Sequence, residues 1–180
     1  MVANFSLKDK NFLSFNINPS QKIILLKLKD SNSSLENEKI GSEFYDYIEK
    51  NSISESAFLE ENIKELIKKN KHFLEEFFHG AKLKSYKFQK YKTKEKNKIF
   101  NINVCIKKGY LNLNKNKRYE SLVQGINFTK DLVSEPGNIL HPDEYAKRLN
   151  QLRKFGLKVT IFDQKKLKKL GMNALLGVGQ

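Results

Sequence analysis

The succession of two kinds of hydrophobic pattern constrains the fold of this chain most strongly. Residues 12–17 alternate apolar and polar positions, and residues 22–29 form a continuous apolar run, as strands do. Residues 63–79 instead repeat apolar side chains at intervals of three and four, which predicts a helix ended by Gly80. A further helix is predicted over residues 36–50, and residues 100–106 return to alternation. This order predicts a small α/β domain.

The same patterns predict which side chains are buried. Leu13, Phe15 and Ile17 share one face of the first strand, and we expect that face to be buried. The apolar run over residues 22–29 is typical of a central strand. The stripe of the helix over residues 63–79 consists of Ile63, Leu66, Ile67, Phe73, Leu74, Phe77 and Phe78.

The second half of the chain begins a new set of elements. A polar connector over residues 111–117 precedes a helix expected over residues 119–133, whose apolar face consists of Leu122, Val123, Ile126 and Val133. Pro136 and Gly137 end that helix and form a turn. Pro142 is expected to open the next helix at its first position, with a buried stripe of Tyr145, Leu149 and Leu152.

Alternating elements are expected to continue after Gly156, which caps that helix. A β-branched strand is predicted over residues 157–162, and Asp163 is expected to cap a helix over residues 165–170. Gly171 ends this helix, and an apolar strand is predicted over residues 174–178. Helix, strand, helix and strand in this order predict the start of a wound α/β domain with a parallel sheet.

The last eleven residues, 170–180, read as a helix end, a turn and the opening of a buried strand. Compact domains do not usually finish on the first half of a core strand. The sequence therefore predicts that this chain is the front part of a longer protein.

The formal net charge of +14 raises the question of nucleic-acid binding. However, 31 of the 34 basic residues are lysine, whereas base readout favours the planar fork of arginine. The densest run, Lys82 to Lys98, interleaves eight lysines with Tyr86, Phe88 and Tyr91 and resembles a site for single strands. The run also alternates as a strand with one solvated face would, and we favour this second interpretation.

A single cysteine, Cys105, excludes an internal disulfide and fits a reducing compartment. No apolar run approaches the roughly 18 residues of a membrane span. The first ten residues lack the basic and apolar regions of a secretion signal. These features predict a cytoplasmic protein.

The residues on which catalysis usually depends are not grouped in this sequence. His72, His79 and His141 are too far apart in sequence to suggest one metal site, and the first two are expected to be solvated helix residues. The glutamates of the helical region, namely Glu60, Glu61, Glu65, Glu75 and Glu76, are expected to form surface ion pairs. Cys105 has no nearby group that would activate it. We therefore predict no catalytic, cofactor-binding or metal-binding residue in this chain.

Three segments carry a resemblance to a known family. They are NFTKDLVSEPGNILHPDEYAKRL (127–149), GLKVTIFDQKKLKKLGMNALLGVGQ (156–180) and FFHGAKLKSYKFQKYKTK (77–94). Together they resemble the junction between the two domains of the leucyl aminopeptidases, also called cytosol aminopeptidases. The resemblance is strong over about residues 73–180 and weak before them. Lys130 and His141 depart from the Arg and Thr that the family usually has at these positions.

The resemblance implies a domain organisation and an activity. It implies a macro-domain-like N-terminal α/β domain over residues 1–117, a linker helix over residues 118–135 and the beginning of a metallopeptidase catalytic domain over residues 136–180. Such enzymes release N-terminal residues from peptides with two divalent metal ions, Mn or Zn, and assemble as homohexamers. Their metal-binding and catalytic motifs do not occur in this sequence, so we expect this chain alone to be inactive.

Two alternatives belong to other functional classes. The first is a non-catalytic basic module that binds nucleic acid through Lys82 to Lys98. The second is a binder of ADP-ribose-type ligands, because the implied N-terminal domain resembles macro domains. The sequence lacks a glycine-rich phosphate loop, which makes this second alternative the weakest.

Overall fold

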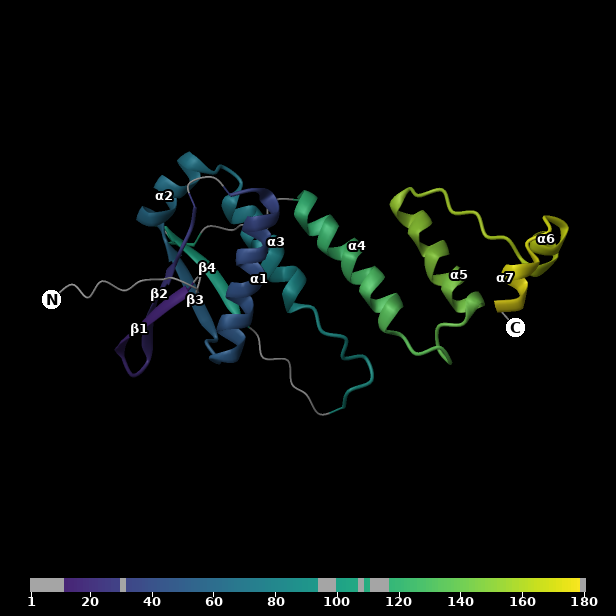
Figure 1. The fold of residues 1–180 in the computed structure, drawn as a ribbon, viewed down its shortest axis with the longest axis horizontal. Coiled ribbons are helices and arrows are strands. Elements are labelled where there is room, and N and C mark those ends of the chain that lie inside the picture. Colours follow the sequence, from purple (N-terminus) through teal and green to yellow (C-terminus); the bar gives the residue numbers. More distant parts are fainter. Residues whose placement is uncertain (1–11, 30–31, 94–99, 107–108, 111–116, 179–180) are drawn as a thin grey trace. The chain divides into compact units, whose positions relative to one another are not determined.

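The computed structural model describes residues 12–29, 32–93, 100–106, 109–110 and 117–178. The chain is a mixed α/β protein, as predicted, and forms two units over residues 1–127 and 128–180 (Figure 1). The connector was predicted over residues 111–117, of which residues 111–116 lie outside the described residues, as do Lys94, Lys96 and Lys98.

The strands of the first unit form two small sheets. β1 (Phe12–Asn18) and β2 (Gln21–Leu26) pair as an antiparallel hairpin. β4 (Asn101–Ile106) lies between β3 (Glu55–Leu59), to which it is parallel, and the short antiparallel β5 (Gly109–Tyr110). A parallel pair needs a long crossover, which the helices between β3 and β4 provide. β3 is an element that the sequence patterns did not predict.

The helices of the first unit correct one prediction. α1 (Ser34–Lys50) begins with a capping box between Ser33 and Glu36, and its extent agrees with the predicted helix. The helix predicted over residues 63–79 is instead two helices, α2 (Glu60–Lys69) and α3 (Phe73–Ser85). Asn70 separates them with an extended backbone, in keeping with the preference of asparagine for helix ends.

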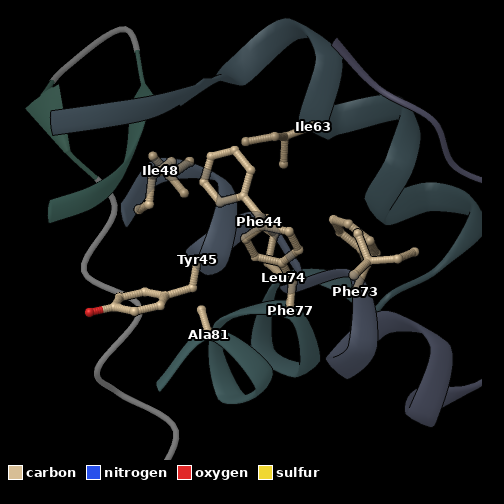
Figure 2. Packing of buried hydrophobic residues seen from close by; sticks show 10 residues of the cluster. Phe44, Tyr45, Ile48, Ile63, Phe73, Leu74, Phe77 and Ala81 are labelled. Atoms are coloured by element: carbon tan, nitrogen blue, oxygen red, sulfur yellow. The ribbon is translucent and has the colours of Figure 1, made fainter. Parts of the chain in front are cut away.

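The core of the first unit lies between the helices and the strands (Figure 2). Phe77 is fully buried, and its ring lies within 5.1–5.7 Å of the rings of Phe44, Phe58, Phe73 and Phe78. Val104 brings β4 into the same cluster, as the alternation over residues 100–106 predicted. Each side chain of this size contributes about 1.5–3 kcal/mol when it is fully buried.

α1 and α3 cross with their backbones in contact. A methyl group added at Gly80 would lie 1.9 Å from the carbonyl oxygen of Glu38, and one added at Gly41 would lie 1.9 Å from that of Phe77. The sequence predicted that Gly80 ends the helix, but Gly80 lies within α3. It allows α3 to approach α1 closely and continue to Ser85.

The hairpin buries the opposite face from the one predicted. Phe12 stacks on Tyr47 of α1, with 5.8 Å between ring centroids, and the Tyr47 hydroxyl bonds to Ser14 at 2.6 Å. Phe15 and Ile17 are exposed. The two-residue period decides which side chains share a face, but it does not decide which face meets the helices.

The second unit contains helices and extended segments. α4 (Lys117–Ser134) begins in the first unit, and the predicted turn follows at Pro136 and Gly137. The elements after this turn are α5 (Pro142–Asn150), the 3-10 helix η2 (Gln151–Phe155), α6 (Gln164–Lys169) and α7 (Asn173–Val178).

The predicted caps of the second unit are confirmed. Pro142 opens α5, and Gly156 ends η2 with a φ of 82°. Asp163 caps α6 by accepting a hydrogen bond from the Lys166 backbone N–H at 2.8 Å. Gly171 takes a φ of 73° after α6. These are local signals, and each acts within one turn of chain.

Both strands predicted for this unit are wrong. Residues 157–162 run without a bridge to any other described segment, and residues 173–178 are helical. A strand needs hydrogen bonds from a neighbouring strand, whereas a helix satisfies its backbone within one segment. With no pairing partner among the described residues, the predicted start of a parallel sheet does not form.

The predicted apolar faces of this half of the chain are at most partly buried. In α4, Val123 is buried, but Leu122 and Val133 are exposed, the latter to 81%. Tyr145 of the predicted α5 stripe is also exposed. None of the residues of α5, η2, α6 or α7 is buried.

Candidate functional site

The described residues contain no group of three or more His, Cys, Asp or Glu side chains placed to hold a metal ion. His72 is exposed at the start of α3, with its Nδ1 3.3 Å from Glu75. His141 precedes α5 and makes no side-chain hydrogen bond to cap it. Cys105 lies on β4. None of these three residues belongs to a potential metal-binding group among the described residues.

A buried carboxylate joins α1 to α3. Glu76 accepts hydrogen bonds of 2.6 Å from the Ser34 hydroxyl and from the Asn37 side-chain amide, and both Glu76 and Asn37 are buried. The expectation that Glu76 forms a surface ion pair is therefore wrong. Its place three residues after Phe73 and four before Gly80 puts it on the buried side of α3, a signal already present in the sequence.

His79 is the second polar contact between these helices, and it is buried rather than solvated as expected. Its Nδ1 lies 2.9 Å from Oε1 of Glu38, and its ring centroid lies 4.8 Å from that of Tyr119 on α4. Burial, followed by the nearby charge of Glu76, raises the pKa of the Tyr119 hydroxyl. The Glu76 and His79 contacts thus connect α1, α3 and the start of α4.

This polar region is structural in character. Within the described part of the chain, the buried Asn37 Oδ1 and His79 Nε2 have no hydrogen-bond partner. A His79 tautomer protonated on Nδ1 donates to Glu38 and leaves only an acceptor at Nε2, which avoids a buried donor without a partner. Glu38, Glu76 and His79 bond to side chains of neighbouring helices, which fits a role in holding α1 against α3.

The lysine run does not form the predicted strand where it is described. Residues 82–85 complete α3, and residues 86–93 contain no helix or strand. Three of its lysines face carboxylates: Lys82 lies 2.7 Å from Glu120, Lys84 lies 3.0 Å from Asp46, and Lys87 pairs with Glu49. These ion pairs offset part of the positive charge that would attract a phosphate backbone.

Arg148 forms an ion-pair cluster within the second unit. Its Nη1 donates to Glu135 at 2.8 Å and its Nε donates to Glu144 at 3.0 Å. The hydrogen bonds to Glu135 and then Glu144 raise the pKa of the Arg148 guanidinium, and the bond from Arg148 lowers the pKa of Glu144. The side chain of Glu135 is only 1% exposed. This cluster links the end of α4 to α5.

The second unit also carries many exposed apolar side chains, which we call the C-terminal apolar residues. They are Val133, Ile139, Tyr145, Phe155, Leu157, Ile161, Phe162, Leu170, Met172, Leu175 and Val178. Monomeric proteins rarely expose large contiguous apolar patches, and such surfaces mark interaction sites. Their number within one short segment makes this region the candidate functional surface of the chain.

No helix in the described part of the chain has the length and apolar character that crossing a bilayer requires.

Comparison with known proteins identifies relatives of the C-terminal part. Residues 127–180 match the family described as "Cytosol aminopeptidase family, catalytic domain". A "Probable cytosol aminopeptidase" of Phytoplasma mali (strain AT) is 44% identical over 110 residues, which are 58% of this chain and 22% of the relative. A protein with the same name from Afipia carboxidovorans is 44% identical over 111 residues, and one from Caulobacter vibrioides is 44% identical over 105 residues. Each alignment covers 56% of this chain.

These matches confirm the resemblance that the sequence motifs indicated. The aligned part spans about a fifth of the length of the curated relatives, 21–22% of each. The segment that matches the catalytic-domain family, residues 127–180, includes all of the C-terminal apolar residues from Val133 to Val178.

Proposed function

Because this chain is related to the cytosol aminopeptidase family through its C-terminal part, we propose that it is the N-terminal part of a leucyl aminopeptidase-like metalloexopeptidase. In this proposal residues 1–117 form the macro-domain-like N-terminal domain and residues 118–135 the linker helix. Residues 136–180 begin the catalytic domain. The substrates of the whole enzyme are peptides, and the enzyme is a cytoplasmic homohexamer.

The observation that supports this proposal is that the family match and many exposed apolar side chains fall on the same segment. The segment that matches a catalytic domain leaves many of its apolar side chains exposed. A domain buries such side chains on further strands and helices, which would also supply the partners for the strand predicted over residues 157–162. The exposed surface is therefore the face on which the rest of the catalytic domain packs.

The metal ions of the family do not fit the residues described in this chain. The described ranges hold no cluster of His, Cys, Asp or Glu with the spacing of metal ligands. We therefore place the two divalent ions, Mn or Zn, on other residues of the whole enzyme and assign no catalytic role to any side chain described above.

A first test measures hydrolysis of a leucyl amide by the purified 180-residue chain in the presence of Mn²⁺ or Zn²⁺. We expect no hydrolysis above that of the metal ion alone. Turnover that saturates with substrate and is lost with a chelator would refute the inactivity of the isolated chain.

A second test transplants the matched segment. Residues 127–180 replace the aligned segment of the Phytoplasma mali relative, whose aminopeptidase activity is first established with the same leucyl amide. We expect the chimera to retain that activity, because its apolar side chains meet the surface that they are suited to cover. A matched chimera carrying Leu157→Asp should lose activity. A folded but inactive first chimera would count against the proposal.

The nucleic-acid alternative stays a prediction with its own test. It requires an affinity for single strands that falls steeply with salt. The three carboxylates that face Lys82, Lys84 and Lys87 argue against it. Absence of binding at low salt would exclude it, and titration with ADP-ribose would decide the remaining alternative.

A further inference from the structure

The turn between α4 and α5 is closed by local backbone hydrogen bonds. The carbonyl oxygen of Pro136 accepts bonds of 2.9 Å from the N–H groups of Ile139 and Leu140. In the first turn of α5, the Tyr145 N–H bonds back to the His141 carbonyl oxygen at 3.0 Å. None of these backbone bonds between described residues joins α5 to α4, so they do not fix the direction in which α5 runs.

Apolar packing does not fix that direction either. None of the residues of α5 is buried, and Tyr145 is 43% exposed. The side chain that reaches α5 from the end of α4 is that of Glu135, which directly follows the last residue of the helix. Its partner on α5 is Arg148. The described link between the two helices is therefore a charged pair, and both of its members lie within residues 128–180.

The burial of Glu135 makes this link demanding. The side chain of Glu135 is 1% exposed and that of Arg148 is 17% exposed. A carboxylate removed from water in this way costs several kcal/mol unless a cation and hydrogen bonds compensate for the lost hydration. Arg148 supplies both through its Nη1, which lies 2.8 Å from Glu135. Any orientation of α5 that withdraws Arg148 removes this compensation.

Arg148 holds two carboxylates with two parts of its guanidinium group. Its Nε donates to Glu144 at 3.0 Å, and Glu144 lies one helical turn earlier on α5. This bond within the helix holds the guanidinium in place while Nη1 donates to Glu135. A lysine here would carry the charge but not the planar fork with its fixed donor directions. We call Glu135, Glu144 and Arg148 the α4–α5 joint.

We propose that Arg148 is a positioning residue that holds α5 in one orientation on the end of α4 and so directs the chain into the elements that follow. The inference rests on the proposed function for its biological meaning, because residues 136–180 begin the catalytic domain in that proposal. The contacts of the α4–α5 joint are complete within residues 135–148. α5 is therefore oriented at the entrance of that domain without help from the rest of it.

The experiment measures the distance between spin labels on α4 and α5 by pulsed electron paramagnetic resonance in the full 180-residue chain. Cys105→Ser removes the native cysteine, and the labels are attached at Val133→Cys and Asn150→Cys, two exposed positions. We expect one narrow distance distribution in this labelled parent. Arg148→Met should widen the distribution at least about twofold, because α5 then samples several orientations.

Glu135→Met tests the same contact from outside α5. It leaves the bond between Glu144 and Arg148 in place, so a wider distribution does not come from a loss of that bond. We expect the same widening as in Arg148→Met, and the double variant should be no wider than either single one. Lys147→Met is the matched control. It removes a positive charge and a 3.5 Å pair with Glu144 from the same helix and should leave the width unchanged.

Far-UV circular dichroism of each variant verifies that its helices remain formed, and Glu135→Met decides the question if Arg148→Met loses helix signal. A broad distribution in the labelled parent, an unchanged width in Glu135→Met, or equal widening in Lys147→Met overturns the proposal. The measurement needs no substrate and no metal ion. Its failure therefore leaves the proposed function standing, whereas an inactive chimera of residues 127–180 leaves the α4–α5 joint standing.

Discussion

The two units of this chain obey the same local rules and differ in what they bury. The first unit begins α1 with the Ser33 capping box and packs an aromatic cluster around Phe77. The second unit caps α6 with Asp163 and ends η2 with Gly156, yet α5 to α7 bury no side chain. The comparison teaches that correct local signals produce helices, whereas a core requires segments that are distant in the sequence.

The polar contacts of the two units differ in the same way. In the first unit the buried polar groups, Glu76 and His79, lie between helices that also share an apolar core. In the second unit the Arg148 cluster links α4 to α5 without a comparable set of buried apolar neighbours. If this comparison is right, substitutions of the same chemical type should have very different effects in the two units.

The largest expected difference is between two phenylalanines. Phe77→Ala removes a fully buried ring and should lower the free energy of unfolding by about 3–5 kcal/mol. Phe155→Ala removes a ring that is 79% exposed and should change it by less than about 0.5 kcal/mol. Urea unfolding followed by circular dichroism measures both. Equal effects would mean that the second unit has a core of its own.

The next difference lies within the first unit, between a glycine at the contact of α1 with α3 and a glycine on α4. Gly80→Ala places a methyl group 1.9 Å from a backbone oxygen of α1 and should destabilise the chain by about 3 kcal/mol. Gly125→Ala on α4 adds a methyl group with no atom within 4 Å and should stabilise it by up to about 1 kcal/mol, from helix propensity. The sign of the change in urea midpoint distinguishes them. A stabilising Gly80→Ala would contradict the close crossing of α1 and α3.

The helix caps should differ less. Ser33→Ala removes the acceptor for the Glu36 N–H and should cost about 1 kcal/mol, because α1 belongs to the cooperative core. Asp163→Ala removes an equivalent bond at α6, and its effect should be confined to local protection from hydrogen exchange. Exchange measured by mass spectrometry on both variants makes the comparison. A global effect of Asp163→Ala would show that the two units unfold together.

The smallest expected effect is a dependence of the stability on pH at the Ser33 capping box of α1. The backbone N–H of Ser33, followed by Lys29, lowers the pKa of Glu36 from 4.5 to about 2. A carboxyl group whose pKa is lower in the folded state stabilises it above the unfolded pKa and loses that contribution as the pH falls through the folded pKa. The stability difference between wild type and Glu36→Gln should therefore be constant from pH 7 to pH 5 and shrink between 4.5 and about 2. A constant difference down to pH 2 would exclude this role for Glu36.

Much of the local structure could be predicted because its causes are local. The extents of α1 and α4, the strand at residues 101–106 and the caps at Asp163 and Gly156 follow from periodicity and from side chains within a few residues. The break at Asn70 was missed because the apolar stripe continues across it at nearly helical spacing. β3 was missed because five residues with one large apolar pair carry a weak signal.

The sequence predicts that this chain contains no metal-binding or catalytic residue, and this stays a prediction.

The sequence patterns could not predict the environment of the polar residues. Glu76 and His79 have the sequence neighbours of surface residues, yet both are buried because Gly80 and Gly41 bring α1 and α3 together. Burial of a polar side chain depends on the donors and acceptors that another helix provides.

The sequence by itself determined the α/β character, the helix caps at Gly156 and Asp163, and the similarity of residues 127–180 to cytosol aminopeptidases. Only the tertiary structure decided which face of the β1–β2 hairpin meets α1, whether residues 157–162 pair as a strand, and where Glu76 and His79 lie. The physical reason is the same in each case. Helix periodicity and caps are properties of neighbouring residues, whereas strand pairing and burial require a second segment whose presence no local pattern encodes.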